Sequence, residues 1–168
     1  VTGNVTGFYG RTGNVSLSSS DIITVGELNS ATGLNADGFK VEEGTYDSST
    51  GLNGSFNFDL EGGHVREYTS ATSGNYFPNF RINSTTGLDT KMDVGDVISA
   101  TLIVASSSHY CTNNIFIDGN NANITKSWVG GSAPSAANGS GFDIYGFTIM
   151  KTASTPAYHV IANAISAA

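Results

Sequence analysis

His109 and Cys111 are the residues whose types and spacing come nearest to a nucleophilic site. They are two positions apart, so they would lie on the same face of a β-strand, where an imidazole could take the proton of the thiol. A reactive cysteine also needs a basic pocket or a helix N-terminus that lowers its pKa, and the neighbouring sequence supplies neither. Because the chain has one cysteine, it can form no internal disulfide framework and no four-cysteine metal site.

The acidic residues suggest two other kinds of chemistry. Asp89, Asp93 and Asp96 lie close together, and three carboxylates could bind Ca²⁺, but their spacing follows no known calcium loop. The segment from Asp118 to Asn123 has no glycine at the sixth position, where a calcium loop requires one, and no terminal glutamate follows. It therefore predicts a turn. A pair of acids for glycoside hydrolysis would have to face each other across a cleft, and the sequence singles out no such pair. Phosphate-binding loops and the serine-nucleophile and zinc-protease motifs are absent. The sequence therefore predicts no enzyme, no cofactor and no metal.

The composition indicates a folded chain with few charges. Charged residues are 12% of the 168 positions, about half the usual share, while Ser, Thr, Asn and Gly fill 76 positions. Hydrophobic residues reach 39%, which is enough for a core. The net charge of −7 argues against binding to nucleic acid or to an anionic membrane surface. No apolar run is long enough to span a membrane, and no signal peptide is visible, so we expect no membrane insertion.

Strand patterns recur along the chain and helical patterns are almost absent. Phe56, Phe58 and Leu60 alternate with polar residues, which is the period of a half-buried strand. Segment 97–105 is apolar on both faces and predicts a strand buried on both sides at the centre of the core. Further strands are expected at 39–42, 77–82, 115–117, 142–150 and 157–162, with turns rich in Gly, Asn and Asp between them. This pattern predicts an all-β chain with an antiparallel β-sandwich or jelly-roll-like domain over residues 25–168.

Short sequence repeats leave two interpretations open. Ser-X-Thr-Gly-Leu begins at Ser30, Ser48 and Ser84, at separations of 18 and 36 residues. It indicates either a ladder of strands and turns, as in elongated fibres, or the chance recurrence of turn words in a chain rich in Ser, Thr and Gly.

Two stretches resemble proteins of bacteriophage tail fibres and other virion appendages. Residues 10–22 are similar to a Thr-Gly-x-Val-x-Leu segment that ends in Asp and an aliphatic residue in phage tail fibres. In this segment, Val15 and Leu17 point to one side of a short strand that cannot bury them alone. The second stretch runs from Asn114 to Ile149 and resembles the ending of many phage fibre proteins, with Trp128 before a Gly-Gly turn and strands on either side.

The resemblance implies a structural protein of the virion surface that forms homotrimers, contacts other virion proteins and attaches to a host. Residues 1–24 would be an extended N-terminal fibre-like segment, with Val15, Leu17 and Ile22 in contact with neighbouring subunits. A capsid decoration protein, or a carbohydrate-binding adhesin module from a cell surface, would suit the same composition. If a host-surface glycan is bound, the candidate contacts are aromatic residues on loops, whose rings stack on sugars. These residues are Tyr68, Tyr76, Phe77, Tyr110 and Trp128.

Overall fold

Nine β-strands and one short 3-10 helix make up residues 44–167, which are the residues that the computed structural model describes. In chain order they are β1 (Gly44–Asp47), β2 (Gly54–Asp59), η1 (Leu60–Gly62), β3 (Val65–Tyr68), β4 (Tyr76–Arg81), β5 (Val97–Ala105), β6 (Phe116–Ile117), β7 (Ile124–Trp128), β8 (Phe142–Ala153) and β9 (Ala157–Ala167).

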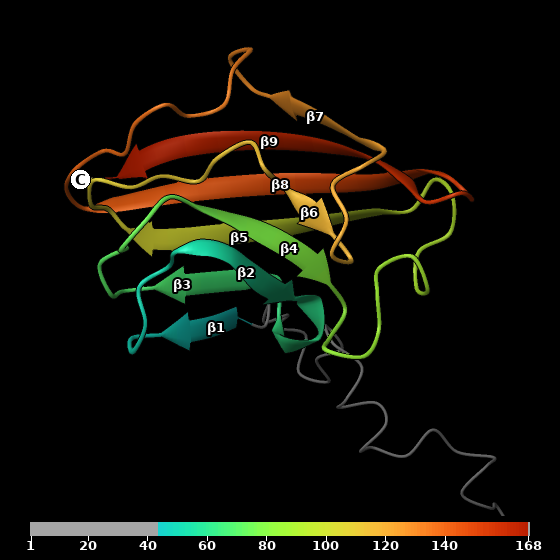
Figure 1. Ribbon diagram of the computed structural model, residues 1–168, viewed down its shortest axis with the longest axis horizontal. Helices are drawn as coiled ribbons and strands as arrows, with labels where there is room; N and C mark the ends of the chain where they lie inside the picture. The colour runs from blue at the N-terminus through green and yellow to red at the C-terminus, as the bar shows by residue number, and fades with distance from the viewer. Residues whose placement is uncertain (1–43, 168) are drawn as a thin grey trace, which may run out of the picture. The chain divides into compact units, whose positions relative to one another are not determined.

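The strands form two sheets that lie one in front of the other (Figure 1). The six-stranded sheet has the order β1-β3-β5-β8-β9-β7, and the three-stranded sheet has the order β2-β4-β6. From β1 to β6 the chain alternates between the two sheets. Parallel neighbours need a long crossover connection, and here the crossover is a strand of the opposite sheet. As a result, β1, β3 and β5 pair in parallel, as do β2, β4 and β6.

This first half of the fold is a short solenoid, in which the second coil follows the first after 21 or 22 residues and the third follows after 36 or 37. Gly44 pairs with Val65, and Gly54 pairs with Tyr76. Polar side chains at equivalent positions also meet: Asn79 Nδ2 donates to Asn57 Oδ1 at 2.9 Å, and Asn83 Nδ2 donates to Glu61 Oε2 at 3.0 Å. Asp59 and Arg81 form an ion pair at the same spacing. A ladder of strands and turns is therefore present, with a period different from the 18 residues that separate two of the sequence repeats.

The second half of the fold adds an antiparallel hairpin. β8 pairs antiparallel with β5 along all nine residues of β5, and β9 pairs antiparallel with β8. β7 then pairs in parallel with β9 and forms the edge of the sheet. Long strands in this hairpin extend the six-stranded sheet beyond the three-stranded one.

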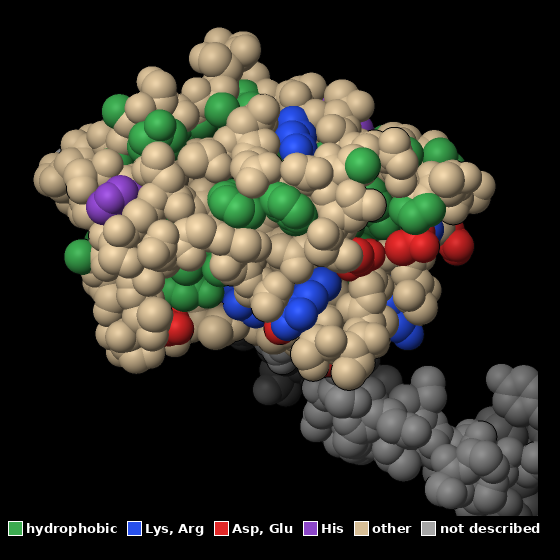
Figure 2. Space-filling view, viewed as in Figure 1, with side chains coloured by type: hydrophobic (Ala, Val, Ile, Leu, Met, Phe, Trp, Pro, Cys, Tyr) green, Lys and Arg blue, Asp and Glu red, His purple; other side chains and the backbone are tan. Residues whose placement is uncertain are grey.

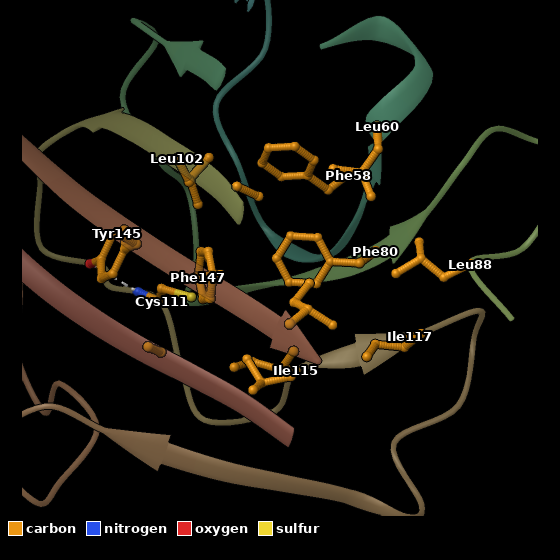
Figure 3. Packing of buried hydrophobic residues seen from close by; sticks show 14 of the residues in the cluster. Phe58, Leu60, Phe80, Leu88, Leu102, Cys111, Ile115, Ile117, Tyr145 and Phe147 are labelled. Atoms are coloured by element: carbon orange, nitrogen blue, oxygen red, sulfur yellow. Dashed lines mark hydrogen bonds between the residues drawn. The ribbon is translucent and has the colours of Figure 1, made fainter. Parts of the chain in front are cut away.

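The core lies between the two sheets and is rich in aromatic rings (Figure 3). Phe80 on β4 lies 5.2 Å from Phe58 on β2 and 5.1 Å from Phe147 on β8, measured between ring centroids. All three rings are buried. Strand alternation explains the arrangement, because every second side chain of each strand points to the opposite sheet.

The all-β class is confirmed, and so are the strands expected at 77–82, 97–105, 115–117, 142–150 and 157–162, to within the ends of β4, β5, β6, β8 and β9. An antiparallel sandwich or jelly roll is not confirmed, because the three-stranded sheet is wholly parallel and the six-stranded sheet is mixed. Period-two patterns fix which face of a strand is apolar and leave its partner undetermined. The expected strand at 39–42 and the expected N-terminal segment 1–24 lie outside the described residues.

Candidate functional site

The outer face of the six-stranded sheet, which points away from the core, presents apolar side chains from several neighbouring strands. Neighbouring strands place aliphatic side chains side by side there: Ile103 pairs with Ile144, and Ile144 pairs with Ile165. Six of the eight large hydrophobic residues that are exposed within residues 44–167 belong to this face. They are Tyr46, Val97, Phe142, Met150, Ile161 and Ile165.

A shallow hollow of about 190 Å³ divides the apolar residues of the outer face into two bands. Gly146, which has no side chain, lies at its centre, and Asn163 Oδ1 accepts a hydrogen bond from the Gly146 amide at 2.8 Å. Ser99, Thr101 and Thr148 complete its polar lining. The outer face therefore has apolar ridges on both sides of a weakly polar groove.

Charge is almost missing from this outer face. Among the outward-pointing strand residues described, Glu67 on β3 is the acidic one, and none is Lys or Arg. The opposite side of the molecule differs: Figure 2 looks toward the three-stranded sheet and shows basic and acidic side chains there. That sheet carries the Asp59–Arg81 ion pair and the Asn57–Asn79 hydrogen bond on its outward surface.

An apolar sheet face without charge is costly to leave in water and is typical of an interaction surface. The sequence predicted that β5 would be buried on both sides, and this is wrong for the described part of the chain. Ala100, Leu102 and Val104 are buried toward the core, whereas Val97 is 48% exposed on the other face. The sequence pattern of β5 is typical of a strand buried on both faces, and residues 44–167 fully bury only the face toward the core.

Two of the five aromatic residues proposed for glycan contact are part of the core. Tyr76 is fully buried, and its hydroxyl donates to the Tyr145 hydroxyl at 3.4 Å. Tyr68 is also buried, with its ring 5.7 Å from that of Phe56. Both lie on strands whose inward positions they occupy, so neither can stack on a sugar in the folded state.

The other three aromatic residues are half-buried at separate places. Phe77 stacks on Phe116 on the outward side of the three-stranded sheet, at 5.4 Å between centroids. Trp128 packs edge-on against Phe147, and its Nε1 donates to Asn113 Oδ1 at 2.8 Å. Tyr110 lies in the connection between β5 and β6. A glycan contact at Phe77, Tyr110 or Trp128 stays a prediction, and the structure does not bring the three into one site.

His109 and Cys111 do not form a thiolate–imidazole pair. Cys111 is fully buried beside Tyr76, and burial raises the pKa of its thiol, so the thiolate is disfavoured. His109 Nδ1 lies 3.2 Å from the Thr72 carbonyl oxygen. This arrangement offers no activated nucleophile.

The acidic cluster near β5 is arranged for structure. Asp89 pairs with Lys151 at 2.6 Å, and the Asp96 carboxylate accepts the Asp93 amide at 2.8 Å. Within residues 44–167 no three His, Cys, Asp or Glu side chains gather as metal ligands do. A search of the same residues for a helix long and apolar enough to cross a membrane finds none. The proposed subunit contacts Val15, Leu17 and Ile22 lie outside the described residues.

Comparison of the chain with known protein families, with curated proteins and with solved structures finds no match.

Proposed function

We propose that the chain is a self-associating structural module of a bacteriophage virion appendage, such as a fibre, exposed on the particle surface. Its apolar outer face would be covered by further copies of the same chain, and a homotrimer is the assembly expected for such a fibre. Other virion proteins and a host surface would be its further partners, with a host glycan as the expected receptor. The single observation that carries the proposal is the neutral apolar face formed by β5, β8 and β9.

The chemistry of this face favours a copy of itself over a charged partner. Complementary charges normally select and orient a different protein, and Glu67 is the charged group that the described outer-face strands offer. Rows of Ile, Val and Met on both partners exclude water without leaving charges buried. A self-complementary apolar surface is therefore consistent with homo-oligomer formation.

The fibre assignment is supported by the stretches that resemble phage fibre proteins. The second stretch forms β6, β7 and most of β8, so it contributes the core strand that carries Phe147 and the edge strand of the six-stranded sheet. A stacked β-structure with little charge also suits a fibre, in which stability comes from strand pairing and packing.

The test is sedimentation velocity of the full chain with lysines placed on the outer face. Replacing both Ile161 and Ile165 with Lys should shift the wild-type oligomer to monomer, because a buried unpaired ammonium group is strongly unfavourable. Val94→Lys is the matched control, since Val94 is exposed on the β4–β5 loop away from this face. If both proteins have the wild-type mass, or if the wild type is a monomer, the proposal fails.

A further inference from the structure

A second candidate site lies where three connections meet at one end of the two sheets. The β4–β5 loop, the β6–β7 turn and the β8–β9 turn surround a pocket of about 370 Å³. This volume falls within the usual range for small-molecule sites. The lining includes Asp89, Asp118, Asn120, Asn123, Ile124 and Tyr158.

Tyr158, which lines this pocket, has a hydrogen-bonding group that is unpaired within residues 44–167. Tyr158 is 4% exposed, and its buried hydroxyl has no hydrogen-bond partner among the described residues. Buried polar groups nearly always have a partner, and exceptions are typical of sites that hold a water molecule or a ligand. Burial raises the pKa of this hydroxyl, and the charges of Asp118 and Asp89 raise it further, so the group stays protonated beside two carboxylates.

Asp118 is held in a fixed position on the wall of the pocket. Its Oδ1 accepts the Leu88 amide at 2.7 Å, and its Oδ2 accepts the Asp89 amide at 3.0 Å. Asp118 and Asn123 adopt positive φ angles of 52° and 58°, which Asp and Asn tolerate in tight turns, so the turn itself sets where these two residues stand on the pocket wall.

The charges around the pocket select the kind of ligand. The carboxylates of Asp89 and Asp118 disfavour an anion. The ammonium group of Lys151 lies 2.6 Å from Asp89 and neutralises that carboxylate, and both oxygens of Asp118 already accept backbone amides, so the pocket offers no free pair of carboxylates to a cation. A ligand hydroxyl can donate to the Asp118 carboxylate and accept from the Tyr158 hydroxyl. Ile117 and Ile124 add apolar contact for carbon-bound hydrogens.

We propose that this pocket binds a small neutral polyhydroxylated molecule, about the size of one sugar ring. The ligand could be a free monosaccharide or the terminal residue of a longer glycan. This site does not depend on the self-association proposed above, because its lining residues lie on connections and inward-facing positions rather than on the outer face.

The test is saturation-transfer NMR and calorimetry of the full chain with glucose, galactose, N-acetylglucosamine and oligosaccharides that end in each. At least one sugar should bind, and Tyr158→Phe should weaken its binding by about tenfold, the value of one lost hydrogen bond. Tyr158→Phe should keep its fold, because the hydroxyl has no protein partner among residues 44–167. The control is Ser55→Ala, which removes an exposed hydroxyl of β2 outside the pocket and should bind like the wild type.

Asn123→Gly provides a second variant, since glycine accepts the positive φ angle and removes the side chain from the pocket. It should also weaken binding. Equal signals from free and chain-linked sugars would identify a monosaccharide site, and a stronger signal from chain ends would identify a glycan-end site. Absence of transfer to every probe, which is the result for a pocket that holds water alone, overturns the proposal. So does undiminished binding by Tyr158→Phe.

Discussion

The buried polar groups around Tyr145 are stabilised by specific partners. The Tyr145 hydroxyl accepts a hydrogen bond from the Tyr76 hydroxyl at 3.4 Å and from the Cys111 amide at 3.2 Å. These groups link β4, β8 and the segment before β6 inside the core. Because leaving any one of them unpaired costs about 1–3 kcal/mol, the cluster ties the two sheets together.

The same cluster predicts sensitivity to alkaline pH. Burial raises the pKa values of Tyr76, Tyr145 and Cys111 above those of the unfolded chain. These three groups therefore bind their protons more tightly in the folded state than in the unfolded chain. Their contribution to the free energy of unfolding is complete below the unfolded pKa values, about 8.5 for Cys and 10 for Tyr. As pH rises further, each group should lower the free energy of unfolding by about 1.4 kcal/mol per pH unit. Urea unfolding from pH 8 to 11 should show this decline, with a smaller slope in Tyr145→Phe. An equal slope in both proteins would contradict the prediction.

Adding one methyl group at Gly51 tests how closely the coils of the solenoid pack against each other. A Cβ at this position would overlap the carbonyl oxygen of Ala71 in the next coil. We expect Gly51→Ala to lower the free energy of unfolding by about 1–3 kcal/mol, because the backbone of two coils must separate. Gly62→Ala is the control, since its Cβ would meet side-chain atoms at 3.6 Å or more. Thermal unfolding of the two variants measures the difference, and equal stabilities would show that the turns are not packed so closely.

Among the elements, the β4–β5 loop is held down by one buried lysine. Lys151 on β8 donates to the carbonyl oxygens of Asp89 at 3.0 Å and Met92 at 2.7 Å, and it pairs with the Asp89 carboxylate. Leu88 and Met92 of this loop are buried in the core. The loop thus covers one end of the core through both apolar and polar contacts.

Lys151→Met should loosen this loop. The change leaves two carbonyl groups and a partly solvated carboxylate without their donor, so we expect a loss of about 1–3 kcal/mol in the free energy of unfolding. Hydrogen exchange should become faster at the amides of Met92 and Gly95, which bond to Leu88 and Lys151. Lys91→Met, in the same loop but exposed, is the control and should exchange like the wild type. Unchanged exchange in Lys151→Met would show that the apolar contacts alone hold the loop.

How far the sequence predicted these elements depends on the kind of information each required. Alternating Phe56 and Phe58, and the apolar run of β5, were sufficient to place strands, because side-chain period is local. Parallel pairing was not predictable, since it depends on which strands of successive coils lie next to each other in space. Strands β1, β3 and β7 escaped notice because they are short and hold polar residues.

The candidate sites were harder to predict than the strands. Tyr76 and Phe77 are adjacent in the sequence, yet one is buried and the other lies on the outward surface, so aromatic type alone could not separate them. The double apolar pattern of 97–105 predicted a strand buried on both sides, and the outer face is the side that residues 44–167 leave partly exposed. The pocket around Tyr158 combines residues from three connections, and nothing local in the sequence marks it.

At the scale of the whole molecule, this protein with few charges presents apolar side chains on one outer sheet face. The inward faces of both sheets form the core, and the outward face of the three-stranded sheet combines the Asn57–Asn79 and Asp59–Arg81 pairs with the stacked rings of Phe77 and Phe116. The outer face of the six-stranded sheet is left as the surface that needs a partner. We propose that a second copy of the chain covers it, an assembly that would bury few charges.

Light scattering of the full chain over a range of concentrations tests this claim most directly. The account predicts a stable species near three times the 17.4 kDa chain mass, which persists on dilution. A mass of 17.4 kDa at every concentration, with the outer face exposed to solvent, would contradict it.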